Sequence, residues 1–342
     1  MTDSLSNIDV AEMPNDLKSV IATIGKAASA LSTVISLGDL YQSTDIKLAS
    51  NADGDEQKSL DIIADNAYFQ ALKGSPVLAY ASEEREDITI INEHGSLLLA
   101  IDPLDGSSNI ECNLSIGSIF SIREYKSELG KTHDGIKNQF LRAGSEQIAA
   151  GYIIFGPQTI LVFTTGRGVF QYTLNRTSNQ FMLIKNKIKI PVETQEYAVN
   201  ASNARHWSKP MRAYIDDSNA GEIGPRDVNF NMRWIASLVA ESHRILTRGG
   251  IFIYPADNRK NYEVGRLRMV YECAPIAFLI EQAGGGATDC IERILDQPAS
   301  SLHARSPLAF GSLNEISRLQ AYHQSPNESS SPLFGRRGLF SS

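Results

Sequence analysis

The most regular alternation of apolar and polar positions lies near the start of the chain. Over residues 16–37 apolar side chains recur every three or four positions, which predicts an amphipathic helix that begins at an Asn15 N-cap and ends at Gly38. The same spacing recurs over 229–246, and two further helical stretches end at Gly74 and at Gly284. We therefore expect further helices over about 56–73, 229–246 and 271–283.

Short apolar runs bounded by turn residues predict strands between and after these helices. The two runs on either side of Gly156-Pro157 are typical of a hairpin. Because helices and strands alternate along the chain, we expect a layered α/β fold. The expected strands are 77–81, 97–101, 115–122, 149–155, 159–164, 197–200 and 251–254.

A change of composition near residue 190 predicts how the chain divides. A lysine-rich stretch precedes Ile190-Pro191, which favours a domain boundary there. The residues from about 324 on are rich in Ser, Pro and Arg and carry few apolar side chains, which is typical of a mobile tail. The expected parts are a flexible N-terminus (1–14), an N-terminal domain (15–192), a C-terminal domain (193–323) and the mobile tail (324–342).

Composition narrows the class of protein. The chain of 342 residues has 32 Lys and Arg against 39 Asp and Glu, a net charge of −7, which argues against a basic face for nucleic acid. Three cysteines are too few for a disulfide scaffold and favour a reducing compartment. The apolar run 152–163 is too short to cross a bilayer, and the acidic N-terminus lacks the apolar core of a signal peptide. We therefore expect a cytoplasmic protein that acts on neither membranes nor nucleic acids.

Acidic residues follow two of the predicted strands directly. Strand 77–81 leads into Glu83 and Glu84, and strand 97–101 leads into Asp102 and Asp105. A lone Asp-Pro or Asp-Gly step is usually only a turn. Four carboxylates at the ends of two strands would repel one another unless a cation lay between them. Oxygen donors without a Cys or His cluster favour Mg²⁺ or Mn²⁺.

The residues that follow Asp105 suit a phosphate group. Gly106 lets backbone N–H groups approach a ligand closely, and Ser107 and Ser108 supply hydroxyl groups. Carboxylates for a metal followed at once by a phosphate cradle indicate metal-assisted hydrolysis of a phosphate ester.

Together these motifs resemble those of class I fructose-1,6-bisphosphatases, which are magnesium-dependent, lithium-sensitive sugar phosphatases. The similarity covers roughly residues 15–320 and implies a layered α/β/α/β/α sandwich assembled as a homotetramer. The matching segments are Asn51-Ala-Asp-Gly-Asp55 with Asp61, Ser82-Glu-Glu84, Asp102-Pro-Leu-Asp-Gly-Ser-Ser-Asn-Ile110, Gly249-Gly-Ile-Phe-Ile-Tyr-Pro255, Gly265-Arg-Leu-Arg268, Tyr271-Glu-Cys273 and Glu281-Gln-Ala-Gly-Gly285.

The resemblance implies two or three Mg²⁺ ions per active site, with Mn²⁺ as a substitute. Most of the implied ligands fall in the domain expected over 15–192. They are Glu83, Asp102, Asp105 and Glu272 for the first ion, Glu83, Asp102 and the backbone carbonyl of Leu104 for the second, and Asp55 with Glu83 for the third.

The resemblance also implies the catalytic and substrate-binding residues. Asp61 and Glu84 match the pair that orients and deprotonates the attacking water, and Asp55 is a third catalytic candidate. Arg233 matches a residue that reaches into the active site of a neighbouring subunit. The substrate-binding candidates, several of them in the domain expected over 193–323, are Asp105, Gly106, Ser107, Ser108, Asn200, Arg233, Tyr254 and Arg266.

The expected activity is release of the 1-phosphate of fructose 1,6-bisphosphate, in gluconeogenesis or in the Calvin cycle. Sedoheptulose 1,7-bisphosphate, alone or as a second substrate, is an open alternative, and an inactive sugar-phosphate sensor is a remote one. The AMP-binding turn of animal family members is replaced here by Met13-Pro-Asn-Asp16, so we expect no inhibition at that place. Residues 123–146 hold no cysteine, so we expect no thiol control either.

Overall fold

The computed structural model describes residues 13–38, 40 and 60–324, which divide into two compact units. Unit 1 contains the residues up to Arg142, Glu146–Lys187 and Ser237–Ala240. Unit 2 contains Ala143–Ser145, Ile188–Ala236 and the residues from Glu241 on. The predicted site residue Asp55, residues 1–12 and all of the expected tail (324–342) except Gln324 lie outside the described residues.

Unit 1 is built on an eight-stranded sheet in the order β2-β1-β3-β4-β5-β6-β7-β8. β1 and β3 run parallel, and every other neighbouring pair in this sheet is antiparallel. The parallel pair matters for function because both of its strands end at the same edge. The strands are β1 (Val77–Ser82), β2 (Thr89–Ile90), β3 (Leu97–Asp105), β4 (Ile116–Glu124), β5 (Ala149–Phe155), β6 (Thr159–Thr164), β7 (Val169–Asn175) and β8 (Gln180–Lys185).

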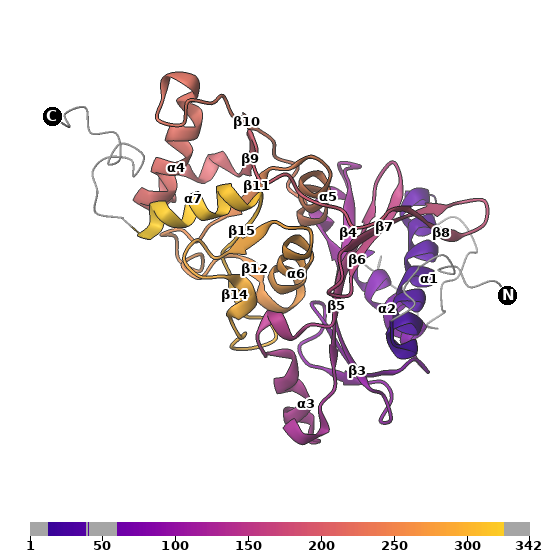
Figure 1. The fold of residues 1–342 in the computed structure, drawn as a ribbon. Coiled ribbons are helices and arrows are strands. Elements are labelled where there is room, and N and C mark those ends of the chain that lie inside the picture. The colour runs from indigo at the N-terminus through magenta and orange to yellow at the C-terminus, as the bar shows by residue number, and fades with distance from the viewer. Residues whose placement is uncertain (1–12, 39, 41–59, 325–342) are drawn as a thin grey trace. The chain divides into compact units, whose positions relative to one another are not determined.

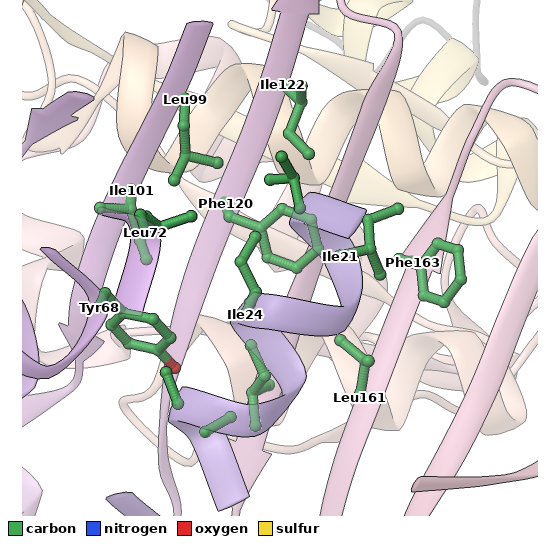
Figure 2. Close-up of a cluster of buried hydrophobic side chains, with 14 of the residues drawn as sticks. Ile21, Ile24, Tyr68, Leu72, Leu99, Ile101, Phe120, Ile122, Leu161 and Phe163 are labelled. Atoms are coloured by element: carbon green, nitrogen blue, oxygen red, sulfur yellow. The ribbon is translucent and has the colours of Figure 1, made fainter. Parts of the chain in front are cut away.

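Two helices cover one face of this sheet. α1 (Asn15–Leu37) packs against β5 and β6, and α2 (Leu60–Leu72) packs against β1 and β3 (Figure 1). The short helix α3 (His133–Phe140) follows β4. The apolar stripes of α1 and α2 pack against the inward-facing side chains of the sheet and form one continuous core with them. Figure 2 shows part of this core: Ile21, Ile24, Tyr68, Leu72, Leu99, Ile101, Phe120, Ile122, Leu161 and Phe163.

The first predicted helix is confirmed, but its N-cap is wrong. α1 already includes Asn15, and Pro14 precedes it without a side-chain cap. Gly38, with φ 51°, ends the helix as expected. α1 is also the one described helix long and apolar enough to cross a membrane, a feature that the sequence analysis missed. Its apolar face lies instead in the core of unit 1, and half of its most apolar window is buried.

Unit 2 is built on a five-stranded sheet in the order β10-β9-β11-β15-β13. β9 pairs in parallel with β10 and β11, whereas β15 is antiparallel to both of its neighbours. β12 (Leu267–Arg268) and β14 (Arg305–Ser306) form a separate small pair. The strands of the larger sheet are β9 (Glu196–Val199), β10 (Asn231–Met232), β11 (Ile251–Tyr254), β13 (Gly286–Thr288) and β15 (Leu308–Gly311).

The helices of unit 2 bury the apolar side chains of this sheet. α4 (Lys209–Asn219) and α7 (Leu313–Gln324) pack against each other and share a core with β9, β11 and β15 (Figure 1). α6 (Ala274–Gln282) packs against β13 and β15. Each unit therefore has the layered α/β architecture that the sequence predicts.

The helix predicted over 229–246 is wrong in its first half. Residues Asn231–Met232 form the edge strand β10, and the helix α5 runs only over Leu238–Arg248. Ala236 has a positive φ of 59°, which interrupts a helix. Ser237 then caps α5, because its hydroxyl oxygen accepts the N–H of Ala240 at 3.3 Å.

The seven predicted strands are confirmed with small changes of boundary, but β2, β7, β8, β10, β12, β13, β14 and β15 were not predicted. The hairpin β5–β6 and strand β11 have the predicted limits, and β9 starts one residue earlier. β3 continues past its predicted end at residue 101 to Asp105. The helix predicted over 271–283 starts earlier, as a π-helical turn over Met269–Cys273 that continues into α6.

Candidate active site

The acidic rim of unit 1 forms where the parallel strands β1 and β3 end. The backbone N–H of Glu83 donates to the carbonyl of Ile101 at 3.0 Å, so the pairing continues one residue beyond β1. Asp102 and Asp105 are buried, at 4% and 8% exposure, and carboxylate oxygens of the two lie within 4.8 Å of each other. Two of the predicted acids, Asp102 and Asp105, therefore lie together at the end of β3 with the Glu83 backbone beside that strand, and the convergence of all four carboxylates stays a prediction.

An irregularity in β3 turns both aspartates toward this rim. The register between β3 and β4 shifts between Asp102 and Asp105, so the strand bulges there. The backbone N–H of Leu104 donates to Asp102 Oδ1 at 3.0 Å, inside the bulge. Ser118 on β4 donates its hydroxyl to the carbonyl of Pro103 at 2.7 Å. The bulge is thus held by hydrogen bonds at several of its backbone groups.

Asp105 has an environment that favours a bound cation. Its Oδ2 accepts the backbone N–H of Val239 at 2.9 Å and the hydroxyl of Ser237 at 3.2 Å. Burial, with a smaller contribution from the negative charge of Glu83, raises the pKa of Asp105 to about 6, even though both hydrogen bonds lower it. Buried carboxylates that crowd one another as oxygen donors fit a hard divalent ion such as Mg²⁺.

One face of α2 meets the rim through three polar contacts at helical spacing. Asp61, at the start of α2, is hydrogen-bonded to the Ser107 hydroxyl. One turn later Asp65 accepts the hydroxyl of Tyr80 at 2.8 Å, and Tyr68 bonds Ser118 Oγ at 2.8 Å. Burial raises the pKa of Asp61, while the Ser107 hydrogen bond opposes that rise. The helix thereby places the predicted water-orienting Asp61 beside the predicted phosphate-binding turn.

The turn predicted to bind phosphate follows Asp105 directly. Gly106 has φ 78°, a conformation that glycine adopts without strain, and a Cβ there would approach Ser237 to 3.4 Å. The next residues form the short 3-10 helix Ser107–Asn109, and Ser108 is exposed. Glu84, which follows β1, is exposed too, and its N–H donates to the Ser82 hydroxyl at 3.2 Å.

The remaining predicted metal ligand belongs to unit 2. Glu272 lies on the π-helical turn, and its side chain accepts the backbone N–H of Arg268 at 2.5 Å. It is 7% exposed. Single π-helical turns are frequent at functional sites. That Glu272 shares an ion with Asp102 and Asp105 stays a prediction.

Two predicted sugar-binding residues share a small pocket in unit 2. Asn200 directly follows strand β9, and Tyr254 is the last residue of β11, which runs parallel to β9. Both residues line this pocket. Asn203 and Asp257 line it too. The pocket thus lies at the carboxyl ends of parallel strands, which is where ligands of α/β proteins bind.

The two predicted substrate-binding arginines are exposed on unit 2. Arg266 donates to the Tyr262 hydroxyl at 2.8 Å, and its guanidinium lies over the Tyr262 ring. The N–H of Arg233 donates to the carbonyl of Tyr197 at 2.8 Å, and its Nε lies 3.6 Å from a Glu196 oxygen. Trp234 stacks on Phe252, with ring centroids 5.8 Å apart, and so fixes the chain next to Arg233.

A separate cavity of about 500 Å³ lies at the start of α1 in unit 1. It includes the residues Met13 to Asp16, whose sequence departs from the animal AMP-binding turn. Ser96 and Arg167 line it as well, and the Ser96 hydroxyl donates to Asp16 at 2.5 Å. The absence of AMP inhibition stays a prediction.

Some residues that contact the acidic rim lie far from it in the sequence and were not predicted. Ser237 could have been found as a helix start, because serine before an apolar helical run is a frequent N-cap. Its bond to Asp105 spans 132 residues and has no local signal. The ion pair in which two nitrogens of Arg85 contact Asp65 Oδ2 likewise shows no sequence pattern.

Known proteins are similar to this chain along almost its whole length. The family models "Fructose-1-6-bisphosphatase, N-terminal domain" and "Fructose-1-6-bisphosphatase, C-terminal domain" match residues 6–186 and 190–324. A class 1 fructose-1,6-bisphosphatase of Cereibacter sphaeroides is 53% identical over 96% of this chain and 97% of its own. That of Paracoccus denitrificans is 52% identical over 97% of this chain and 98% of its own.

A solved structure agrees with the sequence comparison. Holo fructose-1,6-bisphosphatase of Leishmania major superposes with a TM-score of 0.82 at 33% identity, covering 91% of this chain and 96% of its own. The layered α/β fold predicted from the sequence is thereby confirmed. The chain belongs to the class 1 fructose-1,6-bisphosphatase family of phosphatases.

Proposed function

We propose that this chain hydrolyses the 1-phosphate of fructose 1,6-bisphosphate with a metal-activated water, giving fructose 6-phosphate and inorganic phosphate. The observation that carries this proposal is the buried pair Asp102 and Asp105 at the end of the parallel strands, followed at once by the phosphate-binding turn. The names of the relatives supply the substrate.

The donor set fits divalent cations of the magnesium type. Two or three Mg²⁺ ions would be held by Glu83, Asp102, the Leu104 carbonyl and Asp105, with Glu272 and Asp55 completing the set. When bound, such ions lower the pKa of water and stabilise negative charge on the entering and leaving oxygens. Asp105 supports this use because the hydrogen bonds from Ser237 and Val239 orient its carboxylate before any ion arrives.

Two carboxylates would handle the proton of the attacking water. Asp61 and Glu84 lie at the start of α2 and just after β1, and both would accept hydrogen bonds from the water and orient it. Burial raises the pKa of Asp61 toward the working pH, which makes its carboxylate a better proton acceptor. Glu84 is exposed, so its carboxylate can pass the proton to solvent.

The sugar bisphosphate would be held at both ends. Gly106, Ser107 and Ser108 would receive the reacting phosphate, with Asp105 beside them. At the other end Arg266 would neutralise the second phosphate, while Asn200 and Tyr254 would contact the sugar from their shared pocket. Holding both ends converts the attack into an effectively unimolecular step.

Arg233 would complete the second phosphate site from a neighbouring subunit of a homotetramer. Its side chain is 50% exposed in the single chain, so it can reach another copy. Affinity for the substrate would then depend on assembly. An Arg233→Ala variant would raise KM much more than it lowers kcat, since it removes binding from the far end of the substrate.

The proposal is tested by product analysis with two sugars. Fructose 1,6-bisphosphate should yield fructose 6-phosphate, and kcat/KM should exceed that for sedoheptulose 1,7-bisphosphate. A reversed ratio would assign the heptose as the main substrate. Failure of the wild type to release phosphate from either sugar would overturn the proposal. The Glu84→Gln variant should keep the substrate KM while losing most of kcat, whereas a sensor would bind sugar phosphates in both forms and turn over none in either.

A further inference from the structure

An ion pair that no proposed catalytic role uses lies directly behind the rim. Arg85 donates from Nε to Asp65 Oδ2 at 2.8 Å, and its Nη2 lies 2.8 Å from the same oxygen. Asp65 Oδ1 accepts the hydroxyl of Tyr80, so both carboxylate oxygens are engaged. The side chains are largely buried, at 8% exposure for Asp65 and 23% for Arg85. A pair this enclosed and this well directed holds its two segments together more firmly than a surface ion pair.

Aromatic rings fix the arginine from a second direction. The Arg85 guanidinium lies 4.1 Å from the centroid of the Phe69 ring and 5.4 Å from that of Tyr80. Phe69 comes from α2 and Tyr80 from β1. Arg85 is therefore held both by a carboxylate and by ring faces, and it cannot turn away without losing both contacts.

The pair joins the two segments that carry the proposed proton acceptors. Asp65 lies one helical turn after Asp61 on α2, so both side chains face the same side of the helix. Arg85 comes immediately after Glu84, and its N–H donates to the Ser82 carbonyl at 3.2 Å, closing the turn that contains Glu83 and Glu84. The contact of Asp65 with Arg85 therefore links the position of Asp61 to that of Glu84.

We propose that Asp65 and Arg85 are positioning residues that set the separation of Asp61 and Glu84 around the attacking water. This inference rests on the proposed function. Neither residue touches the substrate in this account, and both act through the carboxylates beside them. Catalytic groups must be held to within about 0.5 Å of their productive geometry, and a displacement of about 1 Å can slow a reaction a hundredfold.

The test uses an Arg85→Met and an Asp65→Asn variant. Methionine keeps the apolar stem over Phe69 but removes the guanidinium. Asparagine is the gentler change, because its amide oxygen can still accept the Tyr80 hydroxyl. We expect kcat to fall about tenfold in both, with KM for fructose 1,6-bisphosphate within about twofold of wild type. The magnesium concentration for half-maximal rate should rise, because Glu83 lies in the same turn. Arg85→Lys should recover part of kcat, since it restores the charge without the second N–H donor to Asp65.

A purely structural role predicts a different result. Partial unfolding would lower the concentration of active sites without changing the half-saturating magnesium concentration. Arg142→Met is the matched control, because it removes another partly buried ion pair of unit 1, with Glu146 at 2.8 Å. This control should keep the wild-type kcat and magnesium response.

A double-variant cycle with Glu84→Gln decides whether Arg85 acts through Glu84. If it does, Arg85→Met should lower kcat much less in the Glu84→Gln background than in the wild type. Fully multiplicative losses would overturn the inference, and so would wild-type kcat and magnesium response in folded Asp65→Asn protein. Lack of turnover by the wild type itself would instead overturn the proposed function, and the inference with it.

Discussion

The backbone N–H of Val239 donates a 2.9 Å hydrogen bond to the buried carboxylate of Asp105, 134 residues earlier in the chain. Val239 lies in the first turn of α5, where unpaired N–H groups and the helix dipole both favour negative charge. Ser237 caps the same turn and also donates to Asp105. A helix start thus stabilises, in its charged form, a carboxylate that burial and Glu83 would otherwise neutralise.

Removing the Ser237 hydroxyl should weaken metal binding and the fold together. In Ser237→Ala the Asp105 carboxylate loses one donor and α5 loses its cap, which costs about 1 kcal/mol of stability from the cap alone. The pKa of Asp105 should rise, by about one unit if the lost bond contributes roughly 1.4 kcal/mol. Calorimetric titration with Mg²⁺ and thermal denaturation check both effects. Ser237→Thr retains a hydroxyl and should restore them. A metal affinity unchanged in Ser237→Ala would contradict this role.

Magnesium binding should weaken as the pH falls through about 6. The pKa of Asp105 in the metal-free fold is raised to about 6, above the ordinary value for a carboxyl group. Protonated Asp105 therefore contributes to the folding stability of the metal-free protein at low pH, and this contribution is lost as the pH rises through 6. Mg²⁺ needs the carboxylate, so below pH 6 a proton competes for the same oxygens, up to about tenfold in affinity per pH unit.

The measurement is the rise in melting temperature on adding Mg²⁺, taken at a series of pH values. We expect a clear rise at pH 7.5 that is largely lost at pH 5. The same rise at both pH values would show that no group with a pKa near 6 holds the ion. In Ser237→Ala the midpoint of the loss should move to higher pH.

In the hydrogen-bond chain from Tyr68 through Ser118 to Pro103, loss of the Ser118 hydroxyl should lower the free energy of unfolding more than loss of the Tyr68 hydroxyl. Ser118 donates to Pro103, so the Tyr68 hydroxyl must be the donor in its bond to Ser118. Tyr68→Phe removes one bond and should lower the free energy of unfolding by about 1 kcal/mol. Ser118→Ala leaves two buried groups unpaired and should cost about 2–4 kcal/mol.

Chemical denaturation of the two single variants and of the double variant checks this order. The double variant should cost less than the sum, because removing both partners leaves fewer unpaired groups. A Tyr68→Phe variant that is less stable than Ser118→Ala would contradict the assigned donor and acceptor roles in these hydrogen bonds.

In unit 2, neutralising the buried carboxylate of Glu315 should cause a large loss of folding stability. It accepts the Tyr214 hydroxyl at 2.6 Å and pairs with Arg226 at 2.7 Å, and it also pairs with Arg318. The side chains of Glu315 and Arg226 are only 1% and 3% exposed. Glu315→Gln should cost about 3–5 kcal/mol, since it leaves the guanidinium buried without a counter-charge.

A surface pair supplies the comparison for Glu315. Arg293 pairs with Glu281 and Asp296, and its side chain is 45% exposed. Arg293→Met should cost about 1 kcal/mol or less. Thermal denaturation of both variants gives the contrast, and an equal loss in the two would refute the importance of burial at Glu315.

Local patterns in the sequence predicted seven of the described strands, all rich in buried apolar residues, but missed β2, β7, β8, β10, β12, β13, β14 and β15. β5, β6 and β11 are nearly continuous apolar runs, and a run that is apolar on both faces has clear ends. α1 was predicted for the analogous reason, since its apolar stripe is long and regular. In these elements the local pattern and the final burial agree.

The failure over 229–237 has a tertiary cause. Met232 and Ile235 fit the helical spacing of Val239 and Leu246, but Met232 lies on an edge strand held by parallel pairing with β9. The N–H of Ile235 is taken by the Glu241 side chain at 2.8 Å, a bond made only when the chain folds back. Periodicity alone cannot distinguish that arrangement from one longer helix.

The candidate site shows the same division. Strand ends and the motif after them indicated Asp102, Asp105 and Glu83 from local sequence alone. The hydrogen bond of Ser237 to Asp105 and the ion pair of Asp65 with Arg85 join residues 132 and 20 positions apart in the sequence, and both follow from the fold. The roles of all these candidate residues, Glu272 and Asp55 included, stay predictions.

The most direct test of the central claim is phosphate release from fructose 1,6-bisphosphate by the wild type and by Asp105→Asn. We predict that wild-type turnover needs Mg²⁺ and stops with EDTA, and that Asp105→Asn is slower by at least about a hundredfold at saturating magnesium. Turnover by the wild type in EDTA, or a wild-type rate in folded Asp105→Asn protein, would contradict the assignment of the acidic rim as the catalytic metal site.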